Sequence, residues 1–145
     1  MMTPKRLAVE LDRRLDGPHA DEHTAGAAEL AAEAVRFLNY ATGSHSPEGL
    51  SWPSTVYLVT ADMQLAASRM PQCFGQLADW LRRENAAGML GTDDGTPPAD
   101  VVATAGEWLA RAASFAEHLA SELAALQSAI SGLNGRGPSR AGGAT

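Results

Sequence analysis

The only cysteine of the 145-residue chain lies two residues after a proline, in the stretch "AASRMPQCFGQLADWLRRE". A thiol near a helix start can be stabilised as the thiolate by free backbone N–H groups, which is the chemistry of a nucleophile. Such a nucleophile also needs a base, and no histidine is close to Cys73 in the sequence. Because free cysteine is among the most buried residue types, we interpret Cys73 as a small core residue beside Phe74.

A second candidate site is the pair of histidines in "HADEH". His19 and His23 have the four-residue spacing that can place two imidazoles on one metal ion, with Asp21 and Glu22 nearby. The segment also reads as a helix start, where acidic residues favour the positive end of the helix dipole. No further ligand converges on the pair, and the sequence has no glycine-rich phosphate loop, so we predict no metal and no cofactor.

The segment "RAASFAEH", residues 111–118, begins with an arginine and ends with a histidine. It resembles the arginine-x6-histidine signature of HEPN-type helical ribonucleases, which as a family are usually dimeric helical bundles. The resemblance implies that Arg111 and His118 would carry RNA cleavage. The polar residue that usually follows the arginine is replaced by two alanines here, and both positions fall on an exposed heptad position. We therefore assign no catalytic residue and keep the ribonuclease as an alternative.

Composition narrows the class of partner. The formal net charge is −6, which argues against nucleic acid because a binder needs a basic face to neutralise phosphates. No apolar run approaches membrane-spanning length, and a single cysteine forms no internal disulfide, so we expect a cytoplasmic protein. The phrase "RMPQCFGQLADWL" and the richness in arginine and alanine resemble small uncharacterised all-helical actinobacterial proteins.

Helical periodicity predicts an all-α fold, an elongated antiparallel bundle with a long coiled-coil-like C-terminal helix. Stretches dense in Gly, Pro, Ser and Asp predict loops at 43–53 and 88–98. The expected organisation is a short amphipathic arm over 1–19, a helical bundle over 20–134 with blocks at about 20–42, 53–87 and 98–133, and a disordered tail over 135–145.

Pro71 falls inside the second block. A proline within a helix removes a hydrogen bond and clashes with the preceding turn, at a cost of ~3 kcal/mol. However, the apolar spacing continues in phase across it, and no capping residue stands before it to start a new helix. We predict a kink or a tight break at Pro71.

The third block has the strongest apolar pattern, a heptad spacing that runs from Val102 to Leu133. We expect more apolar surface here than one chain can cover. The residues predicted to make interactions are Trp108, Phe115, Leu119, Leu123, Leu126, Ile130 and Leu133.

We therefore predict a non-enzymatic helical scaffold or regulatory protein that acts through helix–helix contacts. The expected partner is a second copy in a homodimer, and possibly another helical protein. Two alternatives remain open: the HEPN-like ribonuclease, and a binder of a small apolar ligand, which would need an enclosed cavity between helices.

Overall fold

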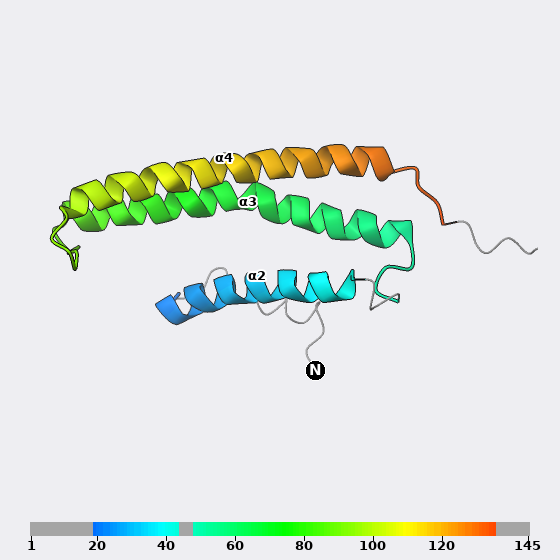
Figure 1. Cartoon of the computed structure of the whole chain (residues 1–145), viewed down its shortest axis with the longest axis horizontal. Helices are drawn as coiled ribbons and strands as arrows, with labels where there is room; N and C mark the ends of the chain where they lie inside the picture. The colour runs from blue at the N-terminus through cyan, green and yellow to red at the C-terminus, as the bar shows by residue number, and fades with distance from the viewer. Residues whose placement is uncertain (1–18, 44–47, 136–145) are drawn as a thin grey trace, which may run out of the picture. The chain divides into compact units, whose positions relative to one another are not determined.

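A computed structural model describes residues 19–43 and 48–135 of the chain, and every element within these ranges is a helix (Figure 1). The helices are α2 (Asp21–Ala41), α3 (Pro53–Ala86) and α4 (Pro98–Ile130). Contacts divide the chain into two units, residues 1–50 with α2 and residues 51–145 with α3 and α4. The predicted all-α class is confirmed. The predicted arm, residues 1–18, and the end of the predicted tail, residues 136–145, lie outside the described residues.

The first unit contributes one amphipathic helix. Asp21 and Glu22 occupy the first turn of α2, where carboxylates favour the positive end of the helix dipole. On its surface Arg36 makes an ion pair with Glu33, with 2.6 Å between Nη2 and Oε2. None of the residues of α2 is buried, and Phe37 is among its most exposed apolar side chains.

Helix α3 begins at Pro53, a position where a missing N–H costs nothing because the first turn has no acceptor for it. The helix then continues through Pro71 to Ala86, so of the two predicted alternatives, a kink or a tight break, the break is wrong. Figure 1 shows a continuous ribbon that curves along its length. The apolar spacing is in phase on both sides of Pro71. Packing of both halves against one neighbouring helix therefore offsets the cost of the proline.

The turn after α3 ends the helix with a Schellman motif. The Gly88 N–H donates to the Asn85 carbonyl and the Met89 N–H to the Glu84 carbonyl, both at 3.0 Å. Gly88 has a φ of 70°, which a side chain would disfavour. The following loop is ordered by Asp94, whose Oδ1 accepts the Thr96 N–H at 3.0 Å.

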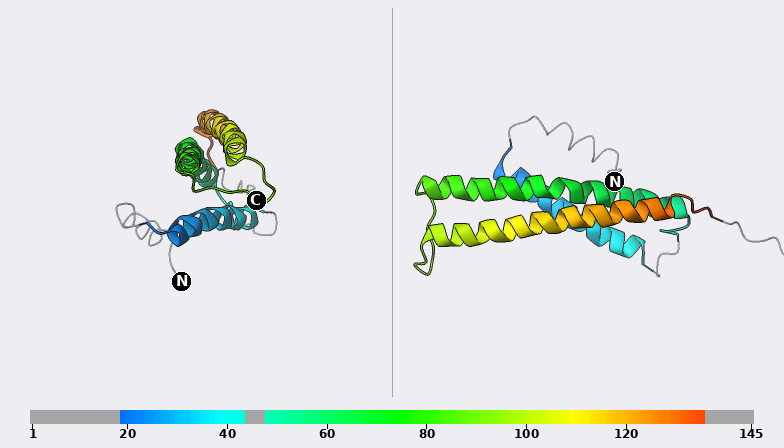
Figure 2. Two further views of the ribbon diagram at one scale, coloured as in Figure 1. Left: turned by 90° about the vertical axis from the view of Figure 1, so that its left-hand side faces the viewer. Right: turned by 90° about the horizontal axis from the view of Figure 1, so that it is seen from above.

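Helices α3 and α4 pack side by side as an antiparallel hairpin (Figure 2). Leu81, near the end of α3, lines a hollow with Val102, near the start of α4. At the other end of the hairpin, Gln64 lines a second hollow with Ala124. Helix α4 ends at Ile130, three residues before the predicted end, so Leu133 lies beyond it.

The two helices meet along one heptad seam each, which we call the inner seam. On each helix it is formed by two rows of residues that repeat every seven positions, the pattern of coiled-coil packing. All of its members are buried or half-buried. The inner seam comprises Thr60, Gln64, Ala67, Pro71, Phe74, Ala78, Leu81 and Asn85 of α3, and Val102, Gly106, Leu109, Ala113, Ala116, Ala120, Leu123, Gln127 and Ile130 of α4.

The most buried residues of the inner seam are small. The buried apolar residues of the described chain are Ala67, Ala78, Val102, Ala116 and Ala120, with Ala67 only 1% exposed. Alanine permits close approach of two helices but removes little apolar surface from water. The inner seam also holds Phe74, Leu81, Leu109, Leu123 and Ile130, but these are only half-buried, and the remaining large apolar side chains of the hairpin lie elsewhere.

Candidate helix-docking surface

A second heptad seam runs along each helix of the hairpin, and we call the two together the outer seam. Each has two rows of residues spaced by three and four, as in the inner seam. The outer seam comprises Val56, Val59, Met63, Ala66, Met70, Cys73, Leu77 and Trp80 of α3, and Val101, Ala105, Trp108, Ala112, Phe115, Leu119, Glu122 and Leu126 of α4.

Both halves of the outer seam lie on the same face of the hairpin. On α3 one outer row precedes an inner row by four residues, as Met63 precedes Ala67. On α4 the same offset holds, as Ala112 precedes Ala116. At about 100° per residue, this offset turns both rows the same way around their helices. Because the helices are antiparallel and their inner seams face each other, equal turns bring the outer rows to one side.

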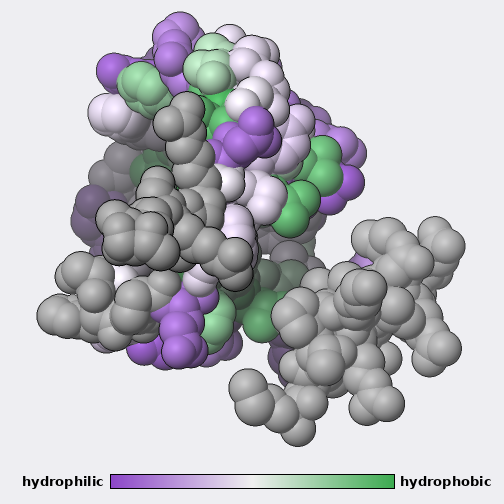
Figure 3. Space-filling view, turned by 90° about the vertical axis from the view of Figure 1, so that its right-hand side faces the viewer, coloured by the Kyte–Doolittle hydropathy of each residue, from purple (hydrophilic) through white to green (hydrophobic). Residues whose placement is uncertain are grey.

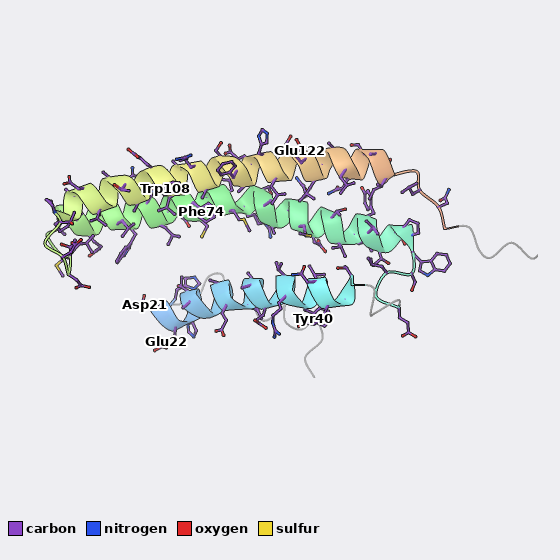
Figure 4. All side chains as sticks on the ribbon, viewed as in Figure 1. Asp21, Glu22, Tyr40, Phe74, Trp108 and Glu122 are labelled. Carbon is purple, nitrogen blue, oxygen red and sulfur yellow. The ribbon has the colours of Figure 1, made fainter. Side chains whose placement is uncertain are left out.

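This face is apolar and exposed. All outer-seam residues except Val59, Ala105 and Ala112 are classed as exposed, and Trp108 and Phe115 are 60% and 71% exposed. Figure 4 labels Trp108 on α4 and Phe74 on α3. The end-on space-filling view shows hydrophobic residues reaching the surface among hydrophilic ones (Figure 3). Large apolar side chains that gather on one exposed face mark interaction sites in folded proteins.

Charge enters the outer seam at a single member, Glu122 of α4. None of the described residues makes a recorded ion pair with Glu122. At the other end of α4, the Arg111 guanidinium lies over the Trp108 ring, 4.7 Å from its centroid, in a cation–π contact. The apolar face therefore has one carboxylate and, at its edge, one guanidinium fixed on an aromatic ring.

The structure separates the predicted interaction residues into three groups. Leu123 and Ile130 are half-buried in the inner seam against α3. Leu133 lies past the end of α4 and is 60% exposed. The remaining four, Trp108, Phe115, Leu119 and Leu126, lie together on the outer seam.

Sequence reasoning missed the α3 half of this face. The apolar spacing that runs in phase across Pro71 was interpreted as a single stripe. In the structure Phe74 and Leu81 belong to the inner seam, whereas Met63 and Met70 belong to the outer seam. The available signal was the width of the stripe. Two heptad rows suffice to cover one neighbouring helix, whereas four rows indicate two neighbours.

The cysteine interpretation is wrong in one respect. Cys73 is exposed, because its row of α3 faces away from α4, whereas the adjacent Phe74 is half-buried. Nucleophilic chemistry gains no support from this position, since Cys73 lies in mid-helix, where backbone N–H groups are already bonded. Over residues 19–43 and 48–135 there is also no group of three His, Cys, Asp or Glu side chains that could hold a metal ion.

The arginine and histidine of the ribonuclease-like segment lie on the outside of α4. Arg111 and His118 are both exposed, and their row is the one farthest from the inner seam. Arg111 is engaged with Trp108. Within the described part of the chain the two side chains line none of the recorded hollows, so the geometry does not favour RNA cleavage.

The hollows between the helices are open rather than enclosed. The apolar one, of about 200 Å³, lies at the loop end of the hairpin and is lined by Leu81, Leu90, Val101 and Val102 among others. The one at the opposite end is polar and is lined by Gln64 and Gln127 among others. Neither matches the enclosed cavity that an apolar-ligand binder would need.

None of the helices in the described ranges is long and apolar enough to cross a membrane.

The comparisons with known proteins are negative. No protein-family profile, curated protein sequence or solved structure matches the chain significantly.

Proposed function

We propose that this protein is a non-enzymatic helical scaffold or regulatory protein that acts through helix–helix contacts as a cytoplasmic homodimer. The observation that carries the proposal is the outer seam. The residues that the hairpin buries most completely are four alanines and Val102, whereas large ones such as Met70, Trp108 and Leu119 are exposed to solvent on one face.

The energetics favour covering this face. Burial of apolar surface contributes roughly 25 cal/mol per Å². The inner seam draws little from this term because its most buried members are mostly alanines. Helices with two seams about a quarter of a turn apart are those of a four-helix bundle, in which each helix has two neighbours. Two hairpins packed face to face form such a bundle.

The apolar face also supports a binding role over a catalytic one. Its residues are aromatic, aliphatic or thioether side chains, apart from the thiol of Cys73 and the carboxylate of Glu122. Large apolar and aromatic side chains dominate the energetics of protein interfaces. A partner that covers this face must itself be largely apolar, so a nucleic acid does not fit.

The test is the mass of the purified full-length chain by light scattering at micromolar concentration. We expect twice the monomer mass of 15.1 kDa, and a decrease toward the monomer on dilution. A monomer throughout this range contradicts the proposal. In that case the outer seam is covered within a single chain, and a monomer that also fails to bind the apolar dye ANS identifies this outcome.

A further inference from the structure

We infer that the second copy packs on the outer seam reversed end to end, so that α4 of one copy lies antiparallel on α4 of the other. In this register Leu119 packs over Ala112 of the second copy, and Leu126 over Ala105 of the second copy. The inference rests on the proposed homodimer and adds to it the symmetry axis and the residue pairs.

Two arrangements place the outer seams of two hairpins against each other. A two-fold axis parallel to the helices sets α4 of one copy on α3 of the other, with both loops at one end. A two-fold axis perpendicular to the helices sets α4 on α4 and α3 on α3, with the loops at opposite ends. Both are closed and self-complementary, so packing and charge must decide between them.

The gradient of side-chain size along α4 fits the perpendicular axis. From the loop end outward, one outer row reads Ala105, Ala112, Leu119 and Leu126. Reversal of the second copy sets the large half of this row on the small half, and interiors fill best when large residues face small ones. The parallel axis, which sets position 112 level with Cys73 of the second copy, brings Leu119 level with Ala66 and Leu126 level with Val59, so it accommodates the same gradient and the choice between the axes rests on charge.

The charges decide between the two axes, and they favour the perpendicular one. When Leu119 lies over Ala112 of the second copy, the two-fold axis passes beside Phe115. Glu122 then lies level with Trp108 of the second copy, over which Arg111 is held at 4.7 Å. A carboxylate and a guanidinium therefore meet on each side of the axis. The parallel axis would leave Glu122 against the apolar Met63.

The area is adequate for a stable dimer. The outer seam extends from Val56 to Trp80 on α3 and from Val101 to Leu126 on α4. At 1.5 Å per residue it is roughly 37 Å long, and two helices side by side are roughly 20 Å wide. This gives on the order of 750 Å² per copy, close to the roughly 800 Å² that each partner contributes to a standard interface.

Thiol cross-linking tests the register. In a Cys73→Ser background, we expect a mixture of Ala112→Cys and Leu119→Cys chains to form a covalent heterodimer with a short thiol-to-thiol reagent. Phe115→Cys should link to the same residue of the second copy because position 115 lies beside the axis. Ala105→Cys alone should not form such a link. The native Cys73 supplies the contrasting test. With Cys73 retained, Ala112→Cys forms covalent dimers only if the axis is parallel to the helices.

A dimer that links through Cys73 and position 112, or that links at none of these positions, overturns the register but leaves the proposed function in place.

A charge exchange provides a second measurement. Glu122→Lys should weaken the dimer by about threefold to tenfold, since exposed ion pairs contribute modestly and two are lost. Arg111→Glu combined with Glu122→Lys should restore part of the affinity, and a double variant weaker than both single variants contradicts the pairing.

Discussion

The two sides of the α3–α4 hairpin differ in the side chains that they present next to the shared inner seam. The outer seam carries methionine, leucine, phenylalanine and tryptophan. The opposite side, which we call the polar flank, is small or hydrophilic apart from Leu58 and Leu65. Its members include Ala61, Ser68, Gln72, Gly75, Asp79 and Arg82 of α3, and Ala103, Glu107, Ala110, Ser114, Glu117, Ser121, Ala124 and Ser128 of α4.

This difference indicates how many neighbours the hairpin has. Both sides are equally close to the inner seam, so packing of α3 on α4 alone would not distinguish them. A hairpin with two apolar sides could add further hairpins without limit, whereas one apolar side closes after a single partner. On the polar flank, Arg82 makes an ion pair with Asp79, as expected for a surface that stays in water.

The largest effect is expected from charges placed in the outer seam. Met70→Asp combined with Leu119→Asp puts two unpaired carboxylates on each copy at the centre of the proposed interface. Because burial of an unpaired charge is costly, the dissociation constant should rise by about 100-fold or more. Light scattering measures this as conversion to a monomer at concentrations where the unmodified chain is a dimer.

The matched control places the same charges on the polar flank, as Ser68→Asp with Ala110→Asp. Helix content by circular dichroism should be unchanged in both double variants, since all four positions are exposed. If the polar-flank variant dissociates as readily as the outer-seam variant, the two sides are equivalent and the assignment of the docking face is wrong.

A smaller effect is expected where the inner seam is tightest. Ala67 is 1% exposed, so Ala67→Leu inserts a large side chain between helices that have no room for it. Overpacking of this kind costs about 1–3 kcal/mol in the free energy of unfolding. Urea denaturation measures the change, at a chain concentration high enough to keep the dimer formed.

The corresponding change on the polar flank is Ala110→Leu, which adds the same side chain to an exposed position of α4. Its free energy of unfolding should stay within about 0.5 kcal/mol of the unmodified chain. Equal destabilisation by the two variants would mean that the hairpin does not pack along the inner seam.

The sequence predicted the helices but not which apolar rows meet. The heptad pattern of α4 contains one row with Val102, Leu109 and Ala116. The second row that packs on α3 can lie either three or four residues after the members of this first row. The prediction took the row three residues later, which contains larger residues such as Leu119. The structure uses the row four positions on, with Ala120 and Gln127, because alanine lets the helices approach closely.

Local rules left the continuity of α3 undecided between a kink and a tight break. The cost of a proline is a local property, whereas the compensating contacts of the helix halves with α4 depend on tertiary packing. The turn was easier to predict, because glycine at Gly88 and the Pro97–Pro98 pair act through local backbone preferences. The docking surface lies between these cases. Its residue types were evident in α4, but its α3 half required the register of the hairpin.

The smallest expected effect is in the loop, which sets the register without belonging to either side. The hydrogen bond from the Thr96 backbone N–H lowers the pKa of the Asp94 carboxyl below its ordinary 3.8. A carboxyl whose pKa is lower in the folded chain stabilises the fold above its unfolded pKa, and this contribution is lost as the pH falls through the folded value. Asp94→Ala should therefore lower the melting temperature slightly at neutral pH, by an amount that shrinks below about pH 4.

Asp94→Asn separates the charge from the turn, because the asparagine Oδ1 can still accept the Thr96 N–H. Its melting temperature should lie between those of the unmodified chain and Asp94→Ala, with a weaker dependence on pH. Since the loop lies outside the outer seam, neither variant should change the dissociation constant of the dimer. A change in that constant would show that the turn shifts α3 along α4, which moves the α3 half of the outer seam relative to the α4 half and ties the docking face to the geometry of the loop.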